Sequence, residues 1–249
     1  MAEHTEVNRQ YFEKLAKSYK TDFQKILEAI CRQVDSRRSW ISDTWTDTEA
    51  GNGKEIKMLE YACGPGAVSL TLAPFVSKVV GLDISEGMID EYNKNAQEAG
   101  FGDKMTALKG DLLAETAPEE LSGPEYFDFD IVVVSMALHH FERPDLAMAR
   151  FCERLKKDGA CLIVDIVPAD DDHHHHHHHH HGPHKVEHGF GNAEHTVKSH
   201  GFTEEQMRQL YEGAGLTGFK YEIMDEQVVF HKDGKELIKT LFIVRGQRA

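Results

Sequence analysis

The stretch Met58-Leu59-Glu60-Tyr61-Ala62-Cys63-Gly64-Pro65-Gly66 decides the fold of this chain. It is a short apolar run that carries an acidic residue, followed by a Gly-x-Gly turn and a helical pattern that starts near Ala67. A second apolar run, Val79-Val80-Gly81-Leu82, ends at Asp83. This order predicts a strand, a glycine turn, a helix and a second strand, with carboxylates at the carboxyl ends of the strands. Open α/β sheets bind nucleotide-like ligands at that edge.

The residues around the turn indicate which kind of nucleotide is bound. Glycine has no Cβ, so the backbone at Gly64 and Gly66 can bend tightly and approach a ligand closely. Asp83 can accept hydrogen bonds from both hydroxyls of a ribose, and Glu60 can face a positively charged amino group. A dinucleotide-binding turn needs a third glycine or alanine, but Ser69 stands at that position. The pattern therefore favours a cationic nucleoside, and a nicotinamide-dependent oxidoreductase is the weaker alternative.

The segment Glu60-Tyr61-Ala62-Cys63-Gly64-Pro65-Gly66 resembles the first motif of the class I S-adenosylmethionine-dependent methyltransferases, in which an acid, any residue and a small residue precede C-G-x-G. The resemblance continues, in order and spacing, over roughly residues 55–249. It runs through Gly81-Leu82-Asp83-Ile84-Ser85, Gly110-Asp111-Leu112, Val134-Ser135-Met136-Ala137-Leu138-His139-His140-Phe141 and Leu155-Lys156-Lys157-Asp158-Gly159. It looks like a small-molecule enzyme of methyltransferase type 11 or 25.

The resemblance implies a fold and a cofactor site. The fold is α/β, a Rossmann-like doubly wound and mostly parallel seven-stranded sheet with a C-terminal antiparallel hairpin and an N-terminal helical cap. The cofactor is S-adenosylmethionine, which leaves as S-adenosylhomocysteine. By the same resemblance, Asp83 holds the ribose, Asp111 accepts from the adenine amino group, and Glu60 faces the amino end of the methionine. The complete expected cofactor site comprises Tyr19, Glu60, Ala62, Cys63, Gly64, Gly66, Asp83, Ile84, Met88, Gly110, Asp111, Leu112, Ser135 and Met136.

Two histidines, His139 and His140, follow the expected fourth strand. An imidazole there can deprotonate a substrate, because its pKa lies near neutrality. The alternative is that at least one of them only fixes the loop. We expect His140, rather than His139, to face the substrate. A base is needed only where the nucleophile carries a proton at the working pH.

Periodicity places the elements. Alternation of apolar runs and helical patterns predicts strands at 56–61, 78–83, 105–109, 129–135 and 160–167, and helices at 67–75, 85–99 and 143–156. Val7, Tyr11, Leu15 and Tyr19 form one helical stripe, and Thr21 with Gln24 predicts a capping box for a second helix. A capping box at Thr203 and Gln206 predicts a late helix, followed by strands near 217–230 and 236–245 around an Asp233-Gly234 turn. Residues 1–53 are thus expected to be a helical cap or lid, and residues 54–249 the cofactor-binding domain.

Composition limits the partners. The formal net charge is −14, with 42 acidic residues against 28 Lys and Arg, so a nonspecific hold on nucleic acid is not expected. The cysteines, Cys31, Cys63, Cys152 and Cys161, show no C-x-x-C pairing, and reduced thiols in a cytoplasmic or nuclear protein are expected. Neither a signal peptide nor an apolar run long enough to span a membrane is apparent.

The segment 168–200 is a low-complexity, histidine-rich loop that contains nine consecutive histidines, His173 to His181. The run lacks the fixed spacing of a zinc site, so no metal is expected. The function expected from the whole sequence is transfer of a methyl group by direct displacement to an O, S, N or C atom of a small molecule. The alternative is a methyltransferase-fold subunit that regulates a protein partner, and a homodimer is left open.

Overall fold

The computed structural model describes residues 2–116, 118–168, 195–232 and 235–249. Its centre is a seven-stranded sheet with the order β3-β2-β1-β4-β5-β9-β6. These strands are β1 (Lys57–Tyr61), β2 (Lys78–Asp83), β3 (Met105–Lys109), β4 (Phe129–Ser135), β5 (Leu155–Ile166), β6 (Leu216–Ile223) and β9 (Leu241–Arg248). The first five strands pair in parallel, and β9 pairs antiparallel with both β5 and β6. The expected mostly parallel sheet with a C-terminal antiparallel pair is confirmed.

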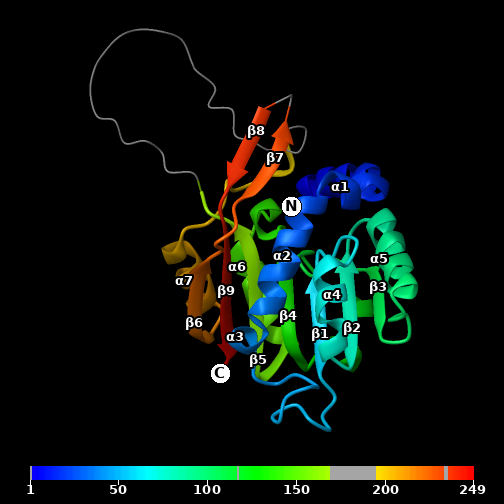
Figure 1. Ribbon diagram of the computed structural model, residues 1–249, viewed down its shortest axis with the longest axis vertical. Helices are drawn as coiled ribbons and strands as arrows, with labels where there is room; N and C mark the ends of the chain where they lie inside the picture. Colours follow the sequence, from blue (N-terminus) through cyan, green and yellow to red (C-terminus); the bar gives the residue numbers. More distant parts are fainter. Residues whose placement is uncertain (1, 117, 169–194, 233–234) are drawn as a thin grey trace.

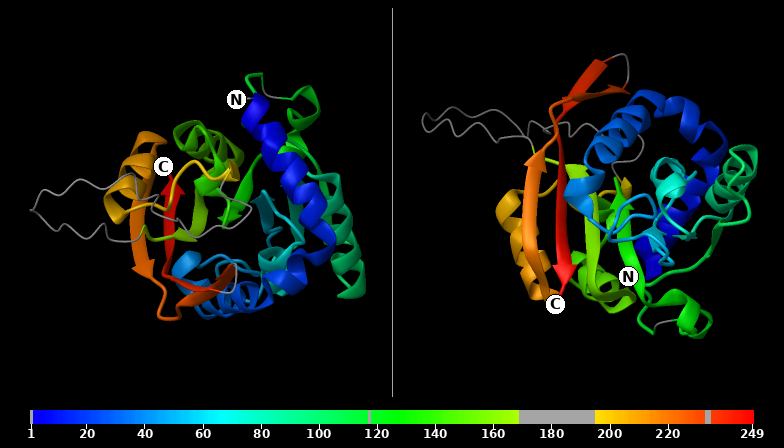
Figure 2. Two further views of the ribbon diagram at one scale, coloured as in Figure 1. Left: turned by 90° about the horizontal axis from the view of Figure 1, so that it is seen from above. Right: turned by 60° about the horizontal axis from the view of Figure 1, so that its bottom comes forward.

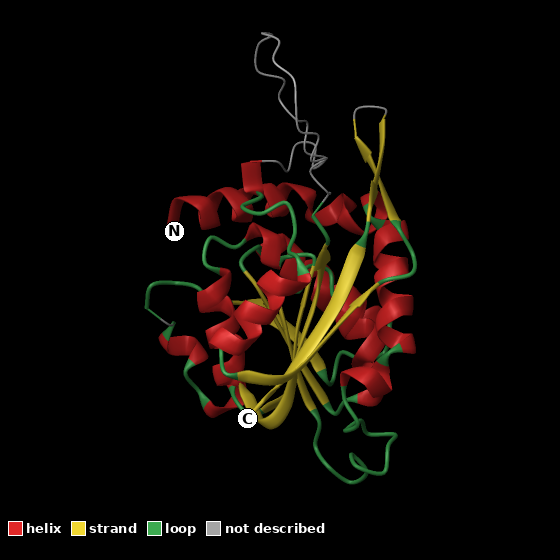
Figure 3. Ribbon diagram, turned by 90° about the vertical axis from the view of Figure 1, so that its left-hand side faces the viewer, coloured by secondary structure: helices red, strands yellow, loops and turns green. Residues whose placement is uncertain are grey.

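Helices cover both faces of the sheet (Figure 3). They are α1 (Ala2–Asp22), α2 (Gln24–Ser36), α3 (Arg38–Ile41), α4 (Ala67–Leu72), α5 (Glu86–Glu98), α6 (Pro144–Arg154) and α7 (Glu204–Gly213), with 3-10 turns η1 (Ala73–Phe75), η2 (Glu119–Leu121), η3 (Pro124–Tyr126) and η4 (Leu138–His140). One core joins α2, α4 and α5 to the sheet through residues such as Ile30, Leu72 and Tyr92. The other joins α6 and α7 through Phe151 and Tyr211. The sheet is therefore doubly wound, as expected.

The carboxyl ends of the parallel strands carry α1, which lies beside α5 at that edge (Figures 1 and 2). The Glu13 carboxylate of α1 accepts hydrogen bonds from the Ser85 hydroxyl, at 2.8 Å, and from the Gly87 N–H, at 3.0 Å. Because the first N–H groups of a helix have no partner within it, this carboxylate completes the start of α5. These contacts hold α1 over the edge where the site was expected.

Two details of the prediction are wrong. The Thr21–Gln24 capping box is absent, because α1 continues to Asp22 and the residue before α2, Phe23, makes no side-chain cap. The last two predicted strands are each divided: β6 and β9 complete the sheet, whereas β7 (Val228–Lys232) and β8 (Lys235–Lys239) form a separate two-stranded sheet. That hairpin extends past the carboxyl edge (Figure 1). The Thr203–Gln206 capping box of α7 is confirmed.

Candidate active site

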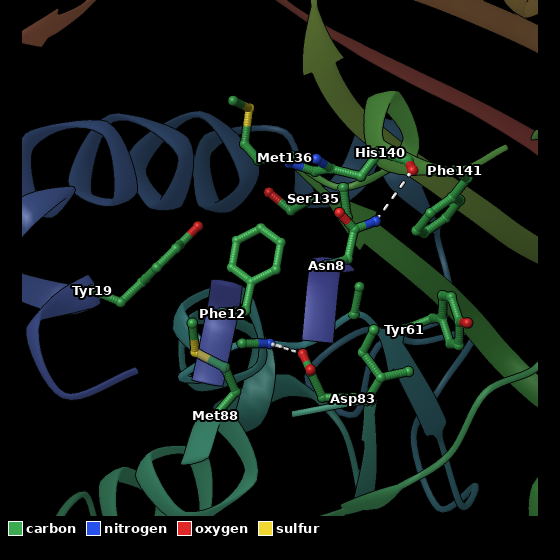
Figure 4. A pocket seen from close by; sticks show the side chains of 14 residues that line it. Asn8, Phe12, Tyr19, Tyr61, Asp83, Met88, Ser135, Met136, His140 and Phe141 are labelled. Carbon is green, nitrogen blue, oxygen red and sulfur yellow. Dashed lines mark hydrogen bonds between the residues drawn. The ribbon is translucent and has the colours of Figure 1, made fainter. Parts of the chain in front are cut away.

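A pocket lies at the carboxyl ends of β1, β2 and β4, under α1 (Figure 4). Its empty volume, open mouth included, is about 610 Å³. The lining residues come from α1, the glycine turn and the ends of three strands. They are Asn8, Phe12, Tyr19, Tyr61, Ala62, Gly64, Asp83, Ile84, Met88, Ser135, Met136, Ala137, His140 and Phe141.

The glycine turn has the left-handed backbone that its sequence predicts. Gly64 has φ +49° and Gly66 has φ +83°. A Cβ on Gly64 would meet no protein atom within 4 Å, so this position presents bare backbone to the pocket. A Cβ on Gly66 would lie 2.6 Å from the ring of Tyr92. Gly64 therefore leaves room at the cavity wall, and Gly66 allows the turn to pack on α5.

Asp83 fits the expected role at a ribose. Its Oδ2 accepts a hydrogen bond from the Gly64 N–H at 2.9 Å, and its Oδ1 accepts one from the Ser85 N–H at 2.9 Å. Burial raises the pKa of Asp83, while these backbone hydrogen bonds oppose the rise. A carboxylate oxygen can accept more than one hydrogen bond, so each oxygen keeps capacity for one hydroxyl of a diol.

Glu60 lies near the site but does not line the pocket. Its Oε2 accepts hydrogen bonds from both the N–H and the hydroxyl of Ser69, and its side chain is buried. Burial raises the pKa of Glu60 to about 7. Asp111 lines an adjoining cavity instead, and four further expected cofactor residues line neither of the two: Cys63, Gly66, Gly110 and Leu112.

Asp111 lies in a smaller cavity that adjoins the pocket and shares Asn8, Tyr61, Ile84, His140 and Phe141 with it. Its Oδ1 accepts hydrogen bonds from the Tyr61 hydroxyl, at 3.0 Å, and from the Leu113 N–H, at 2.8 Å. Burial, followed by the charge of Asp111, raises the pKa of Tyr61 well above its ordinary value, so the phenol stays protonated. Leu113, rather than the expected Leu112, lines this cavity.

α1 contributes Asn8, Phe12 and Tyr19 to the pocket (Figure 4). Tyr19 was expected, and burial raises its pKa to about 12. Asn8 and Phe12 were missed, because the sequence pattern emphasised a stripe one position away, through Val7, Tyr11 and Leu15. The i, i+4 series Asn8, Phe12 and Ala16 was the available signal, but its polar first member made it look less apolar.

The two histidines have different environments. Nδ1 of His140 donates to the carbonyl of Thr196 at 2.9 Å, which leaves Nε2 as the acceptor nitrogen of a ring that lines the pocket. Burial, and secondarily the neighbouring His139, lowers the pKa of His140 well below its ordinary value. His139 is buried outside the pocket, with Nδ1 at 2.7 Å from Oδ1 of Asp165. The arrangement can therefore take up a proton at Nε2 of His140.

No group of three or more metal-ligating side chains occurs among the described residues, and the tract His173 to His181 lies outside them. Across the part of the chain that the structure describes, no helix is long and apolar enough to cross a membrane.

Comparison with known proteins identifies the family. Residues 52–217 match the methyltransferase domain family. The chain is 30% identical over 112 residues to an uncharacterized methyltransferase of Schizosaccharomyces pombe, covering 45% of this chain and 39% of that protein. It is 28% identical over 115 residues to the ubiquinone biosynthesis O-methyltransferase of Pseudomonas fluorescens, covering 46% and 45%. The alignments thus span less than half the length of these two relatives.

Among solved structures, the magnesium protoporphyrin IX methyltransferase of Synechocystis with bound S-adenosylmethionine has the same fold. It aligns with a TM-score of 0.61 and 17% identity over 99% of this chain and 97% of that one. The family match covers more than half of the chain. Gly64 and Asp83, which line the pocket, fit a nucleoside sulfonium. The chain belongs to the class I methyltransferases, whose cofactor is S-adenosylmethionine.

Proposed function

We propose that the chain transfers a methyl group from S-adenosylmethionine to a small-molecule acceptor by direct displacement. One observation carries the proposal: the acceptor nitrogen of His140 and the carboxylate of Asp83 belong to residues that line the same pocket. The pocket thus combines a place for the ribose with a base on the side of β4. Both histidines were catalytic candidates in the sequence, and the proposal gives the proton transfer to His140 alone.

The geometry of the pocket supports the following assignment of the residues that would hold the cofactor. Asp83 would accept from the ribose hydroxyls, and Gly64 would let the backbone approach the methionine portion. Ile84 and Met88 supply apolar surface for the adenine, and Asp111 in the adjoining cavity would accept from its amino group. When bound, S-adenosylmethionine supplies an activated methyl group on a sulfonium.

The protein's own work is alignment, exclusion of water and removal of a proton. Phe12, Tyr19 and Phe141 wall the pocket with aromatic rings, which keeps the reacting groups dry and in a fixed geometry. The lowered pKa of His140 keeps its imidazole unprotonated near neutral pH, and Thr196 fixes the tautomer. Nε2 can then accept the proton of a hydroxyl or an amine as the nucleophile attacks. His139 and Asp165 hold the turn that carries His140.

The relatives support a small-molecule acceptor. Several are ubiquinone biosynthesis O-methyltransferases, which favours an oxygen nucleophile over sulfur, nitrogen or carbon. The acidic net charge argues against nucleic acid as the substrate. The four cysteines are free thiols, which supports a reducing compartment such as the cytoplasm or nucleus. We also infer that residues 1–53 serve as the cap of the domain formed by 54–249, with α1 covering the pocket.

Calorimetric titration with S-adenosylhomocysteine, followed by incubation with a labelled methyl donor and a metabolite extract, tests the proposal. We expect micromolar binding and a labelled product, and we expect His140→Gln to keep the binding but lose most of the labelling. Failure to bind S-adenosylhomocysteine would contradict the cofactor site. Binding without any labelled metabolite, together with a co-purified protein, would favour the regulatory subunit instead.

A further inference from the structure

Asn8 of α1 is a buried polar residue whose carbonyl oxygen has no partner. The residue is 7% exposed, and Oδ1 makes no hydrogen bond within the described structure. Its Nδ2 faces the backbone carbonyl of His140 at 3.4 Å, a position that only the amide nitrogen can occupy favourably. Oδ1 is therefore an acceptor with no donor. Most buried polar groups are paired, so an unpaired one at a pocket indicates a ligand that supplies the missing donor.

His140 provides a second acceptor nearby. Its Nδ1 is committed to Thr196, so Nε2 carries a lone pair. Figure 4 shows the Asn8 amide beside the His140 ring, on the side of the pocket bordered by Phe12, Ser135 and Met136. Asp83 and Met88, the residues assigned to the nucleoside, lie at the opposite side of this view. The two acceptors therefore lie on the side of the pocket away from the residues assigned to the nucleoside.

The charge and shape of the pocket restrict that molecule further. None of the described residues that line this pocket is a lysine or an arginine, whereas Asp83 is an acid. The adjoining cavity, which shares Asn8 and His140, includes Arg143, but the guanidinium of Arg143 is paired with the carboxylate of Asp145. An anionic acceptor would thus lose its hydration without gaining an opposite charge. Phe12, Phe141 and Met136 offer flat or adaptable apolar surface, which suits an aromatic ring.

We propose, building on the methyl-transfer function above, that Asn8 and His140 together select an uncharged aromatic alcohol that carries a second hydrogen-bond donor near the reacting hydroxyl. The reacting hydroxyl gives its proton to Nε2 of His140 while its oxygen bonds to the methyl carbon. The bond from that carbon to sulfur breaks, sulfur keeps the electron pair, and His140 later releases the proton to water. The second donor binds Oδ1 of Asn8, which makes Asn8 a specificity-determining residue.

The test measures binding of small phenols to the protein saturated with S-adenosylhomocysteine, so that no turnover is needed. The probes are catechol, 2-methoxyphenol, which lacks the second donor, and 3,4-dihydroxybenzoate, which adds a negative charge. Asn8→Leu keeps the number and branching of the side-chain heavy atoms but removes the acceptor, together with the Nδ2 donor to the His140 carbonyl. Gln10→Leu, on the exposed face of the same helix, is the matched control.

We expect catechol to bind the wild-type protein more tightly than either other probe. Asn8→Leu should weaken the binding of catechol about tenfold, because one hydrogen bond to a buried acceptor is lost. The binding of 2-methoxyphenol and of S-adenosylhomocysteine should remain unchanged. Gln10→Leu should match the wild type throughout. With S-adenosylmethionine, mass spectrometry should then detect methylated catechol.

Four outcomes would overturn the inference: no binding of catechol, tighter binding of the anionic probe, an equal loss for catechol and 2-methoxyphenol, or a loss confined to S-adenosylhomocysteine. The last would assign Asn8 to the cofactor instead. All four presuppose a protein that binds S-adenosylhomocysteine. If the wild-type protein does not bind it, the proposed function itself fails, and the two failures are thereby distinguished.

Discussion

Nδ1 of His139 lies 2.7 Å from Oδ1 of Asp165, and both side chains are buried behind the pocket. The other carboxylate oxygen of Asp165 accepts from the backbone N–H of His139 at 3.2 Å. The carbonyl of His139 in turn accepts from the N–H groups of Lys198 and Ser199. Residue 139 thereby ties the end of β4 to β5 and to the segment after residue 194. His140 is the next residue of the same 3-10 turn, η4.

Asp165→Ala should therefore destabilise the protein strongly. It leaves the imidazole and the backbone N–H of His139 buried without this acceptor, and each buried polar group that loses its partner typically costs about 1–3 kcal/mol. Urea unfolding measures the loss. Asp225→Ala is the control, because that side chain is 92% exposed, and it should change the free energy of unfolding by less than about 0.5 kcal/mol. Similar unfolding midpoints for both variants would refute the proposed tie.

Three glycines with positive φ, Gly53, Gly66 and Gly64, allow the effects of backbone strain, of packing and of ligand access to be measured separately. Gly53→Ala should cost only the backbone strain, about 1 kcal/mol, since its Cβ would meet nothing within 4 Å. Gly66→Ala should cost more, because its Cβ would approach the ring of Tyr92 to 2.6 Å. Gly64→Ala should be as stable as Gly53→Ala yet bind S-adenosylhomocysteine at least tenfold more weakly, because its Cβ enters the pocket. Thermal unfolding and calorimetry check the three variants together.

Wild-type affinity of Gly64→Ala for S-adenosylhomocysteine would contradict this prediction. The open position at Gly64 would then not be where the cofactor approaches the backbone.

The fold was predictable because each core element carries a local signal that agrees with its neighbours. The apolar runs of β1, β2 and β4 stand between helical patterns, and this alternation leaves few topologies other than a parallel sheet. The division of the last strands was not predictable in the same way. An apolar, β-branched run such as Val228-Val229-Phe230 predicts a strand but does not determine which strand it pairs with. Only tertiary packing places β6 and β7 in different sheets.

The site was predictable where backbone geometry required a residue type. Gly64 and Asp83 fall into this class, because a glycine turn and a carboxylate at a strand end leave a mark in the sequence. Asn8 and Phe12 left only a weak helical series, because which face of α1 meets the pocket depends on how α1 rotates against α5. Glu60 shows the reverse case: its place in the motif was clear, but its carboxylate bonds to Ser69 instead of lining the pocket.

Asp83→Ala should abolish most of the affinity for the cofactor. It removes the acceptor assigned to the ribose and also frees the N–H groups of Gly64 and Ser85. Hydrogen bonds to a charged group contribute roughly 1.5–3 kcal/mol each, so the loss of both bonds to the ribose should raise the Kd for S-adenosylhomocysteine by roughly 100- to 10,000-fold. Asp103→Ala, at an exposed position, serves as the control. An unchanged Kd in folded Asp83→Ala protein would remove the main support for the nucleoside site.

Glu60 should make the free energy of unfolding depend on pH. Burial is the main cause that raises its pKa from 4.5 to about 7, so the folded protein binds this proton more tightly than the unfolded chain does. The contribution of Glu60 to stability is therefore fully present below pH 4.5 and is lost as the pH rises through about 7. Glu60→Gln keeps an oxygen that accepts from both donors of Ser69 but has no proton to lose. The free energy of unfolding of Glu60→Gln, relative to that of the wild type, should therefore increase between pH 4.5 and about pH 7 and then level off.

Urea unfolding at a series of pH values between 5 and 8 measures this difference. His140, whose pKa burial lowers, changes stability in the opposite direction, but it is present in both proteins and cancels in the comparison. Glu98→Gln, at an exposed position of α5, should differ from the wild type by a constant amount. A flat difference for Glu60→Gln as well would mean that Glu60 is already ionised in the folded protein below pH 5. Its carboxylate would then be better solvated than its position under Ser69 indicates.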